Sequence, residues 1–367
     1  MSLEQKWPIA LRMVWLTGGL VAINEAGQTG VQIKSNPLGR TFGTFSLNTY
    51  AELFSRLRSL GLRIIGTTFV TDPKQLDGLR APEFRAAGLD GGWPVWDAKR
   101  LWRQIAHTSS RNGNHGLLDV AARIAAALHY SQMRLHDLTM SYSSQLHSSL
   151  HNREPEAYRA FKDTNSAAVY KDIHSLFWEM AVLRDVLSEF IAAFCIGRKD
   201  ATTLSGLLRS LNKNSSTDPC AEEVIRISDA KNVDGWLGKF GSYRDCFTHS
   251  APLDLVRGFA FAVQDQIVLQ DSSTVPQIYY PLPENPADLA RQRRQGILID
   301  PTDASKPGFT RKHERAKEPD AVEYLHGRLC EFTNLAIRLV ARSPVPPEPI
   351  TFTNDDIVGE VKVSRGS

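Results

Sequence analysis

Two long stretches of the chain contain neither glycine nor proline, and no other feature of the sequence constrains the fold as strongly. They cover residues 117–154 and 156–196, and Pro155 separates them. Glycine and proline are the residues that most often interrupt helices, so stretches of this length without them are typical of long helices. The sequence therefore predicts two long helices with a turn over residues 151–155.

The second stretch also carries an apolar stripe. Its members follow one another at alternating steps of four and three residues: Val169, Ile173, Leu176, Met180, Leu183, Leu187, Phe190 and Phe194. This spacing places the side chains on one face of a helix, which must be buried against other helices. A third helical pattern covers residues 221–237, and a fourth starts at Pro319, a residue favoured at the first helical position. We therefore expect residues 116–342 to form an antiparallel bundle with an irregular insertion at 252–315.

The N-terminal part of the chain, residues 1–115, has mixed patterns. Residues 48–60 predict a helix, and residues 62–70 predict a β-branched strand. Residues 76–115 are rich in glycine, proline and tryptophan, which is typical of a packed connector. Together with the bundle, these patterns predict a mainly α-helical fold: a helical bundle with a small N-terminal α/β module of unknown role and a C-terminal tail over 343–367.

Charge and composition restrict the function. The chain of 367 residues has 43 basic and 40 acidic side chains, a net charge of +3. A protein that binds nucleic acid through its overall charge is far more basic, so any such binding must come from a local patch. No apolar run approaches the roughly 20 residues that cross a bilayer, and the N-terminus has no signal-peptide core. Four widely spaced cysteines without a CxxC pair predict reduced thiols and no structural zinc, so we expect a cytoplasmic protein without a membrane partner.

The segment most indicative of chemistry contains Arg244, Asp245 and His249. Metal-independent cleavage of RNA takes a proton from the ribose 2′-hydroxyl and delivers one to the leaving oxygen, and histidine suits either task because its pKa lies near neutrality. The Arg244 guanidinium would stabilise the charge of the phosphorane, and Asp245 would hold Arg244 or tune His249. On a regular α-helix five positions rotate by about 500°, so Arg244 and His249 would diverge by roughly 140°. The glycines before the segment and Pro252 after it suggest a short helix or irregular turn instead.

This segment resembles the signature of the HEPN superfamily (higher eukaryotes and prokaryotes nucleotide-binding domains). In that signature an arginine, commonly followed by a polar residue, precedes a histidine by four to six residues, and Arg244, Asp245 and His249 match it. The resemblance covers residues of about 117–342 only, where the long helices agree with the family's helical bundle. It implies a metal-independent endoribonuclease without a cofactor. It also implies an RNA substrate, a homodimer that brings two motifs into one cleft, and a role in toxin–antitoxin or antiviral defence, with an antitoxin or another protein as a further partner.

Other interpretations stay open. A similar pair, Arg123 and His129, lies inside the first long helix with an apolar residue after the arginine, and it is the weaker match. The same bundle is compatible with a non-catalytic protein that binds RNA, a nucleotide or a partner protein. The function could also reside in residues 1–115 alone.

Histidines form a second stripe on the first long helix. His129, His136, His147 and His151 fall within roughly 60° of one another at 100° per residue. The i,i+4 pair His147 and His151 has a spacing that can chelate a metal, but no carboxylate or cysteine lies nearby in sequence as a third ligand. The pattern favours a polar border of the apolar face, and we expect no metal site.

A basic stretch covers residues 306–317. Within it Arg311, Lys312 and Arg315 are the strongest candidates for binding RNA phosphates beyond the motif, and a solvated loop without a ligand is the alternative. No GxSxG or GxxxxGK[ST] motif occurs in the chain, so the sequence predicts neither that type of serine hydrolase nor a P-loop enzyme.

Overall fold

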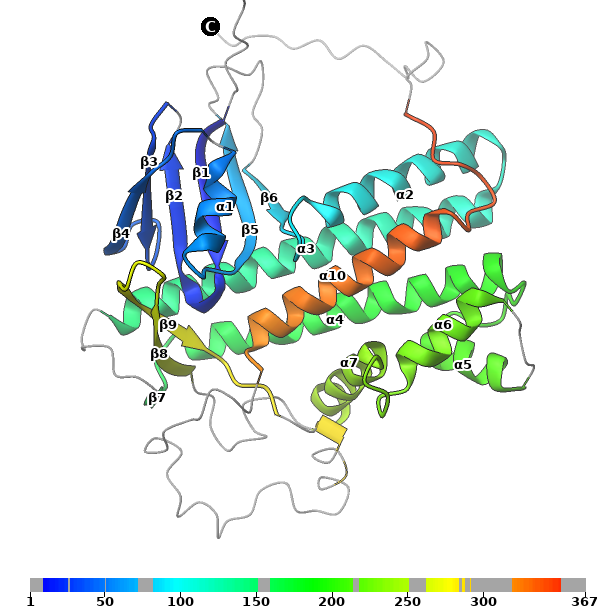
Figure 1. Cartoon of the computed structure of the whole chain (residues 1–367). Helices are drawn as coiled ribbons and strands as arrows, with labels where there is room; N and C mark the ends of the chain where they lie inside the picture. The colour runs from blue at the N-terminus through cyan, green and yellow to red at the C-terminus, as the bar shows by residue number, and fades with distance from the viewer. Residues whose placement is uncertain are drawn as a thin grey trace, which may run out of the picture.

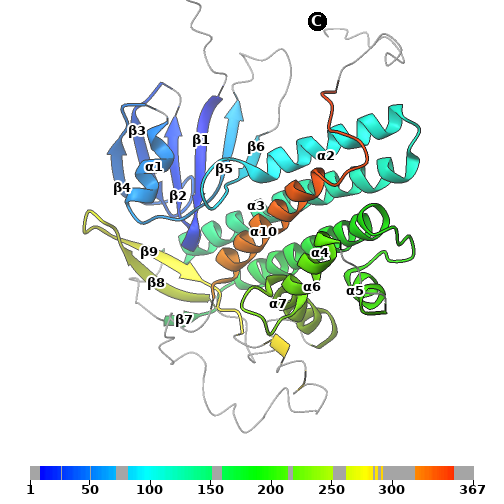
Figure 2. The ribbon, with the colours of Figure 1, turned by 45° about the vertical axis from the view of Figure 1, so that its right-hand side comes forward.

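Four long helices form the centre of the protein, and they lie side by side in both views of the computed structural model (Figures 1 and 2). The structure describes residues 9–25, 27–49, 51–71, 82–150, 159–213, 218–250, 262–283, 286, 287, 291 and 319–350. The four helices are α2 (Pro94–Arg111), α3 (His115–Ser149), α4 (Ser166–Phe190) and α10 (Ala321–Val340). The two long helices and the C-terminal helix predicted from the sequence are confirmed, whereas α2 lies where a connector was expected.

Apolar packing and a few polar bonds hold this bundle together. Seven of the eight residues of the α4 stripe, all except Phe194, are buried, as their spacing predicts. Asp320 begins α10, because its side chain accepts a hydrogen bond from the amide of Glu323 at 3.2 Å and so caps the helix. Trp102 of α2 donates its indole N–H to the carbonyl oxygen of Ala336 in α10 at 3.1 Å. The four helices therefore form one packed unit.

A six-stranded antiparallel sheet precedes the helices, and it contradicts the expected mainly α-helical fold. The strand order is β4-β3-β2-β1-β5-β6. The strands are β1 (Ile9–Leu16), β2 (Val21–Glu25), β3 (Gly30–Lys34), β4 (Thr41–Ser46), β5 (Ile64–Thr71) and β6 (Glu83–Ala86). Helix α1 (Glu52–Ser59) lies in front of the sheet in Figure 1 and buries Leu53 and Leu57. The fold is thus a mixture of helix and sheet. Strands β3 and β4 are short and rich in glycine, threonine and polar residues, so they lack the apolar runs that predict strands.

Helix α3 joins the sheet to the bundle. Trp15 of β1 donates its indole N–H to the hydroxyl of Thr68 in β5 at 2.8 Å, and Thr68 also bonds to the ring of His136 on α3 at 3.0 Å. The His136 ring stacks on Phe84 of β6, with ring centroids 4.5 Å apart. Buried apolar residues of the sheet and of the long helices form one continuous core. Part of the predicted histidine stripe therefore holds the sheet on α3.

Three short helices, a second antiparallel sheet of order β7-β8-β9 and two π-helices complete the described fold. They are α5 (Leu204–Lys213), α6 (Pro219–Ser228), α7 (Trp236–Asp245), β7 (Arg159–Phe161), β8 (Ala262–Val268), β9 (Thr274–Tyr279), η3 (Ile191–Cys195) and η4 (Cys246–Ser250). The single helix expected over 221–237 is wrong, because a tight turn separates α6 from α7. At Gly235 in this turn a Cβ atom would lie 1.7 Å from the carbonyl oxygen of Asp229. Strands β8 and β9 lie within the expected irregular insertion at 252–315, so this part of it is regular.

The Gly18-Gly19 pair, which lacks a dinucleotide-binding spacing, has a structural role in the turn η1 (Thr17–Gly19) between β1 and β2. Both glycines have a positive φ, of 73° and 85°. A Cβ atom on Gly19 would lie 2.8 Å from the carbonyl oxygen of Tyr142 in α3, and one on Gly18 would lie 2.4 Å from Cβ of Gln277 in β9. The turn is therefore wedged between α3 and the small sheet.

Within the described residues, no helix combines the length and the apolar character needed to cross a membrane.

Candidate functional site

The predicted motif lies where α7 passes into η4, and an aromatic cluster fixes both segments on α4. Phe177 of α4 is central to it: the ring centroids of Phe240 and Phe247 lie 5.5 and 5.1 Å from that of Phe177. Tyr243 adds a ring at 6.0 Å, and its hydroxyl donates to the carbonyl oxygen of Pro283 at 2.6 Å. All four aromatic side chains are buried. This packing holds the motif in one orientation on the bundle.

Arg244 pairs with its neighbour in sequence. Its Nη1 donates to Oδ1 of Asp245 at 2.7 Å. The Arg244 side chain is 23% exposed, against 58% for Asp245. Its Nε is enclosed and has no hydrogen-bond partner within the described residues. A further acceptor can therefore be reached only by the terminal nitrogens of the guanidinium, and Asp245 restricts their orientation.

The backbone after Arg244 departs from a regular α-helix. Residues Cys246–Ser250 form the π-helix η4, whose i→i+5 hydrogen bonds make a wider turn. A wider turn rotates each residue by less than about 100°, so positions 244 and 249 diverge by less than the roughly 140° of a regular helix. The irregular turn expected from the sequence is present here. The side chain of His249 lies outside the described part of the chain.

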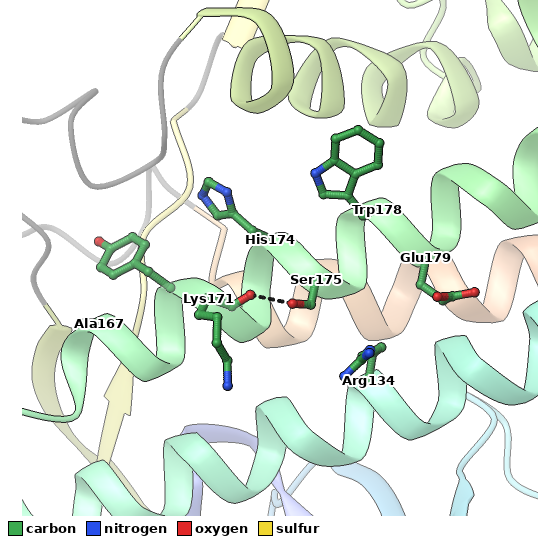
Figure 3. A pocket seen from close by; sticks show the side chains of 8 residues that line it. Arg134, Ala167, Lys171, His174, Ser175, Trp178 and Glu179 are labelled. Atoms are coloured by element: carbon green, nitrogen blue, oxygen red, sulfur yellow. Dashed lines mark hydrogen bonds between the residues drawn. The ribbon is translucent and has the colours of Figure 1, made fainter.

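An open hollow of about 580 Å³ adjoins the motif (Figure 3). Helices α3 and α4 line it with Arg134, Ala167, Tyr170, Lys171, His174, Ser175, Trp178 and Glu179. His174 connects the hollow with the motif, because its ring stacks on Phe247 of η4 with ring centroids 5.4 Å apart. Figure 3 shows His174 and Trp178 projecting from one side of α4, and Arg134 and Lys171 lying between α4 and α3.

A second hollow, of about 440 Å³, continues the first along the same helices, and Arg134 and Lys171 line both. The charges there are mixed, because Arg134 pairs with Asp137 at 3.3 Å and Lys171 with Asp172 at 3.0 Å. Burial raises the pKa of Glu179, and Arg134 opposes this shift. Helical spacing places five exposed apolar side chains around the hollows: Tyr130, Met133, Met140, Trp178 and Val182. We refer to this surface, with both hollows, as the α3/α4 face.

Other residues singled out in the sequence lie elsewhere. The predicted RNA-binding residues and one histidine of the stripe lie outside the described residues: Arg311, Lys312, Arg315 and His151. Arg123 pairs with Asp119 and Glu189, both at 2.7 Å, and so ties α3 to α4. On the regular helix α3 it diverges from His129 by roughly 120°, so the weaker arginine–histidine match is not brought together.

The cysteines are unreactive in the described part of the chain, and His147 contacts a serine. All four cysteines are free, and burial raises the pKa of each thiol, to about 12 for Cys195 and to about 11 for Cys246. Such thiols stay protonated at neutral pH and are weak nucleophiles. Nδ1 of His147 lies 3.4 Å from the hydroxyl of Ser35, in the turn after β3. No group of three or more metal-ligating side chains occurs within the described residues.

His174 and Trp178 were not predicted as part of the site. They lie four residues apart on α4, away from its apolar stripe, and this spacing shows that they share a face. Only the packing of η4 on α4 places His174 beside the motif. No protein-family model, curated protein or solved structure matches this chain. Arg244 and its surroundings are therefore the features of this chain that indicate a function.

Proposed function

We propose that the protein is a metal-independent endoribonuclease of the HEPN type that acts through Arg244, Asp245 and His249. The observation that supports it most is the Arg244–Asp245 pair at the passage from α7 into η4, the π-helix that contains the backbone of His249. π-Helical segments occur frequently at functional sites. Here the wider turn reduces the divergence between the arginine and the histidine.

Each residue has a defined task in this proposal. His249 takes the proton of the ribose 2′-hydroxyl or delivers one to the leaving 5′-oxygen. Arg244 donates hydrogen bonds to the non-bridging phosphate oxygens, which gain charge as the 2′-oxygen attacks phosphorus. Asp245 keeps the guanidinium in position. The products are a 2′,3′-cyclic phosphate and a 5′-hydroxyl.

A second copy of the chain is the proposed occupant of the α3/α4 face. Ser175 lies four residues from both Lys171 and Glu179 on α4. When two α4 helices cross antiparallel at Ser175, two-fold symmetry sets Lys171 against Glu179 of the partner subunit and Glu179 against Lys171 of the partner subunit. The same contact buries the exposed side chains of Trp178 and Val182. Because this face adjoins η4, both motifs then lie beside one interface.

Cleavage of labelled single-stranded RNA in the presence of EDTA tests the catalytic assignment. We expect the wild-type protein to yield products that end in a cyclic phosphate. We expect Arg244→Ala and His249→Ala each to lower the cleavage rate by about 100-fold or more, because each removes a group that acts in the transition state.

Two surface variants serve as matched controls. Arg226 pairs with Asp234 at 2.8 Å on an exposed surface of α6, much as Arg244 pairs with Asp245. His115 is exposed at the start of α3. Arg226→Ala and His115→Ala should cleave at the wild-type rate. Undiminished cleavage by Arg244→Ala or His249→Ala would overturn the assignment, and wild-type protein that retains RNA intact would favour the non-catalytic binder.

A further inference from the structure

Positive charges gather around Trp96, on elements that do not carry the motif. The Trp96 cluster consists of Arg85 of β6, Trp96, Lys99 and Arg103 of α2, and His129 of α3. Cζ of Arg85 lies 4.4 Å from the centroid of the Trp96 ring, and Nζ of Lys99 lies 4.3 Å from it. The electron-rich ring attracts both cations and holds them near each other. In Figures 1 and 2, α2 and β6 lie on one side of the bundle and α7 on the other.

The Trp96 cluster holds three cationic side chains, Arg85, Lys99 and Arg103, beside the carboxylate of Glu83. Glu83 raises the pKa of both Lys99 and His129, and it is already paired with Arg85 at 3.0 Å. Lys99 and Arg103 lie four residues apart on α2, a spacing at which like charges repel. Burial lowers the pKa of Lys99, and both neighbouring arginines lower it further. An anion bound at this place would relieve the repulsion.

The charged groups of the cluster are partly accessible to a ligand, although Nε of Arg85 and Nδ1 of His129 are enclosed and have no hydrogen-bond partner within the described residues. The Arg85 side chain is 28% exposed, Lys99 is half-buried, and Arg103 is exposed. An arginine held by an aromatic ring presents its planar donors in a fixed direction, which suits the oxygens of a phosphate.

We infer that the Trp96 cluster binds backbone phosphates of single-stranded RNA, as a second contact of the substrate away from the motif. The identity of the polymer rests on the proposed function, whereas the anionic character of the ligand rests on the cluster itself. Phosphate contacts carry no sequence information. The Trp96 cluster therefore adds affinity for RNA long enough to reach it, and it leaves the sequence preference and the chemical step unchanged.

Binding measured without cleavage tests this inference. A fluorescently labelled 40-nucleotide RNA is titrated with the His249→Ala protein at several salt concentrations, and anisotropy gives the dissociation constant. Introducing Lys99→Ala and Arg103→Ala into the His249→Ala protein should raise the dissociation constant for RNA by about tenfold. It should also reduce the slope of log affinity against log salt by about 1.4, because each single-strand phosphate contact contributes roughly 0.7.

The matched control removes an equal charge from an equivalent spacing. Arg209 and Lys213 are exposed and lie four residues apart on α5, so Arg209→Ala with Lys213→Ala changes the net charge equally. The control should retain the parental affinity and slope. Thermal unfolding of both double variants confirms that each is folded.

Distinct outcomes decide between the two proposals. If wild-type protein never cleaves RNA but binding depends on Lys99 and Arg103, the proposed nuclease function fails and the inference stands. If cleavage occurs and the cluster variant binds RNA as the control does, only the inference fails. Polyglutamate, a polyanion without phosphate, tests whether the cluster selects phosphate. If it competes with RNA equally well in the parental protein and in the cluster variant, the assignment to phosphate stands. If polyglutamate binding is lost in the cluster variant, the assignment to phosphate is overturned.

Discussion

His326 of α10 is a titratable side chain in the core, and its burial has a consequence for stability. The residue is 1% exposed, and its Nε2 lies 2.7 Å from the carbonyl oxygen of Ala87. Burial lowers the pKa of His326 to about 4, and the hydrogen bond to Ala87 opposes this shift only in part. In the unfolded chain the pKa of a histidine is about 6.5. Between these values the unfolded state binds more protons than the folded state, so the stability provided by neutral His326 is complete above about pH 6.5 and is lost as the pH falls toward 4.

His326→Gln removes this titration and keeps a donor for the Ala87 carbonyl. We expect the free energy of unfolding of the wild-type protein to fall between pH 7.5 and 5 by about 2 kcal/mol more than that of the variant. Urea unfolding at the two pH values measures the difference. Equal pH dependence of the two proteins would show that His326 titrates normally in the folded state.

The close approach of η1 to α3 requires glycine at position 19. Its φ is 85°, and a Cβ atom there would lie 2.8 Å from the carbonyl oxygen of Tyr142. Gly27 has a similar φ of 74°, and apart from its chain neighbours no described atom lies within 4 Å of an added Cβ, so Gly27→Ala measures the backbone strain. We expect about 1 kcal/mol of destabilisation from Gly27→Ala and at least about 2 kcal/mol more from Gly19→Ala. Equal losses in urea unfolding would contradict the close approach of η1 to α3.

At the scale of elements, the aromatic cluster decides where α7 and η4 lie. Phe177 is buried, and its ring contacts Phe240, Tyr243 and Phe247. We expect Phe177→Ala to cost about 3–5 kcal/mol of stability because it leaves a large cavity. Amide hydrogen exchange should accelerate more in α7 and η4 than in α2, and RNA cleavage should fall in parallel.

Phe177→Leu fills most of the space and serves as the milder comparison. Its stability loss and its loss of cleavage should both be smaller than those of Phe177→Ala. Hydrogen exchange that rises uniformly along the chain in Phe177→Ala would show that the cluster supports the whole core and does not specifically position the motif.

The helices and strands differ in how well the sequence predicts them. Helices α3 and α4 follow from the absence of glycine and proline and from apolar spacing, and α10 follows from its apolar spacing. Pro319 lies just before the N-cap Asp320 and not at the first helical position, where it was expected. Helix α2 also has a stripe, in Val95, Trp102 and Ile105, but its glycine- and tryptophan-rich flanks gave the pattern of a connector. The short strands β3 and β4 carry no such signal. Pairing of β3 with β2, and of β4 with β3, stabilises them rather than local preference.

The candidate site was predictable only in part, for a related reason. Arg244 and Asp245 are neighbours in sequence, so their pairing needs no tertiary contact. The π-helix η4 depends on packing against α4, and the Trp96 cluster depends on β6 and α2 meeting through the core. Local spacing in α2 shows that Lys99 and Arg103 share a face, but it cannot reveal that Arg85 joins them.

At the scale of the whole molecule, the exposed apolar side chains of the α3/α4 face require an explanation. Trp178 is 53% exposed, and charges of both signs surround it on this face. An apolar surface with mixed charges is better suited to a contact between two copies of the chain than to a nucleic acid. We expect a mass of twice 40.9 kDa in light scattering after gel filtration. Trp178→Asp should give monomers with impaired cleavage, whereas Leu38→Asp, which changes a side chain 93% exposed on the turn between β3 and β4, should stay dimeric.

Charge exchange tests the proposed symmetry itself. Lys171→Glu alone sets a glutamate against Glu179 of the partner subunit, so it should weaken the dimer. Glu179→Lys alone sets two lysines together, with the same effect. Because a two-fold axis near Ser175 makes each residue the partner of the other, the double variant restores opposite charges at both contacts and should recover the dimer and its cleavage activity. If the losses of dimer affinity from the two single variants simply add in the double variant, the contact between subunits lies elsewhere. The charge pairing exists only where α4 meets α4 of the partner subunit in this register.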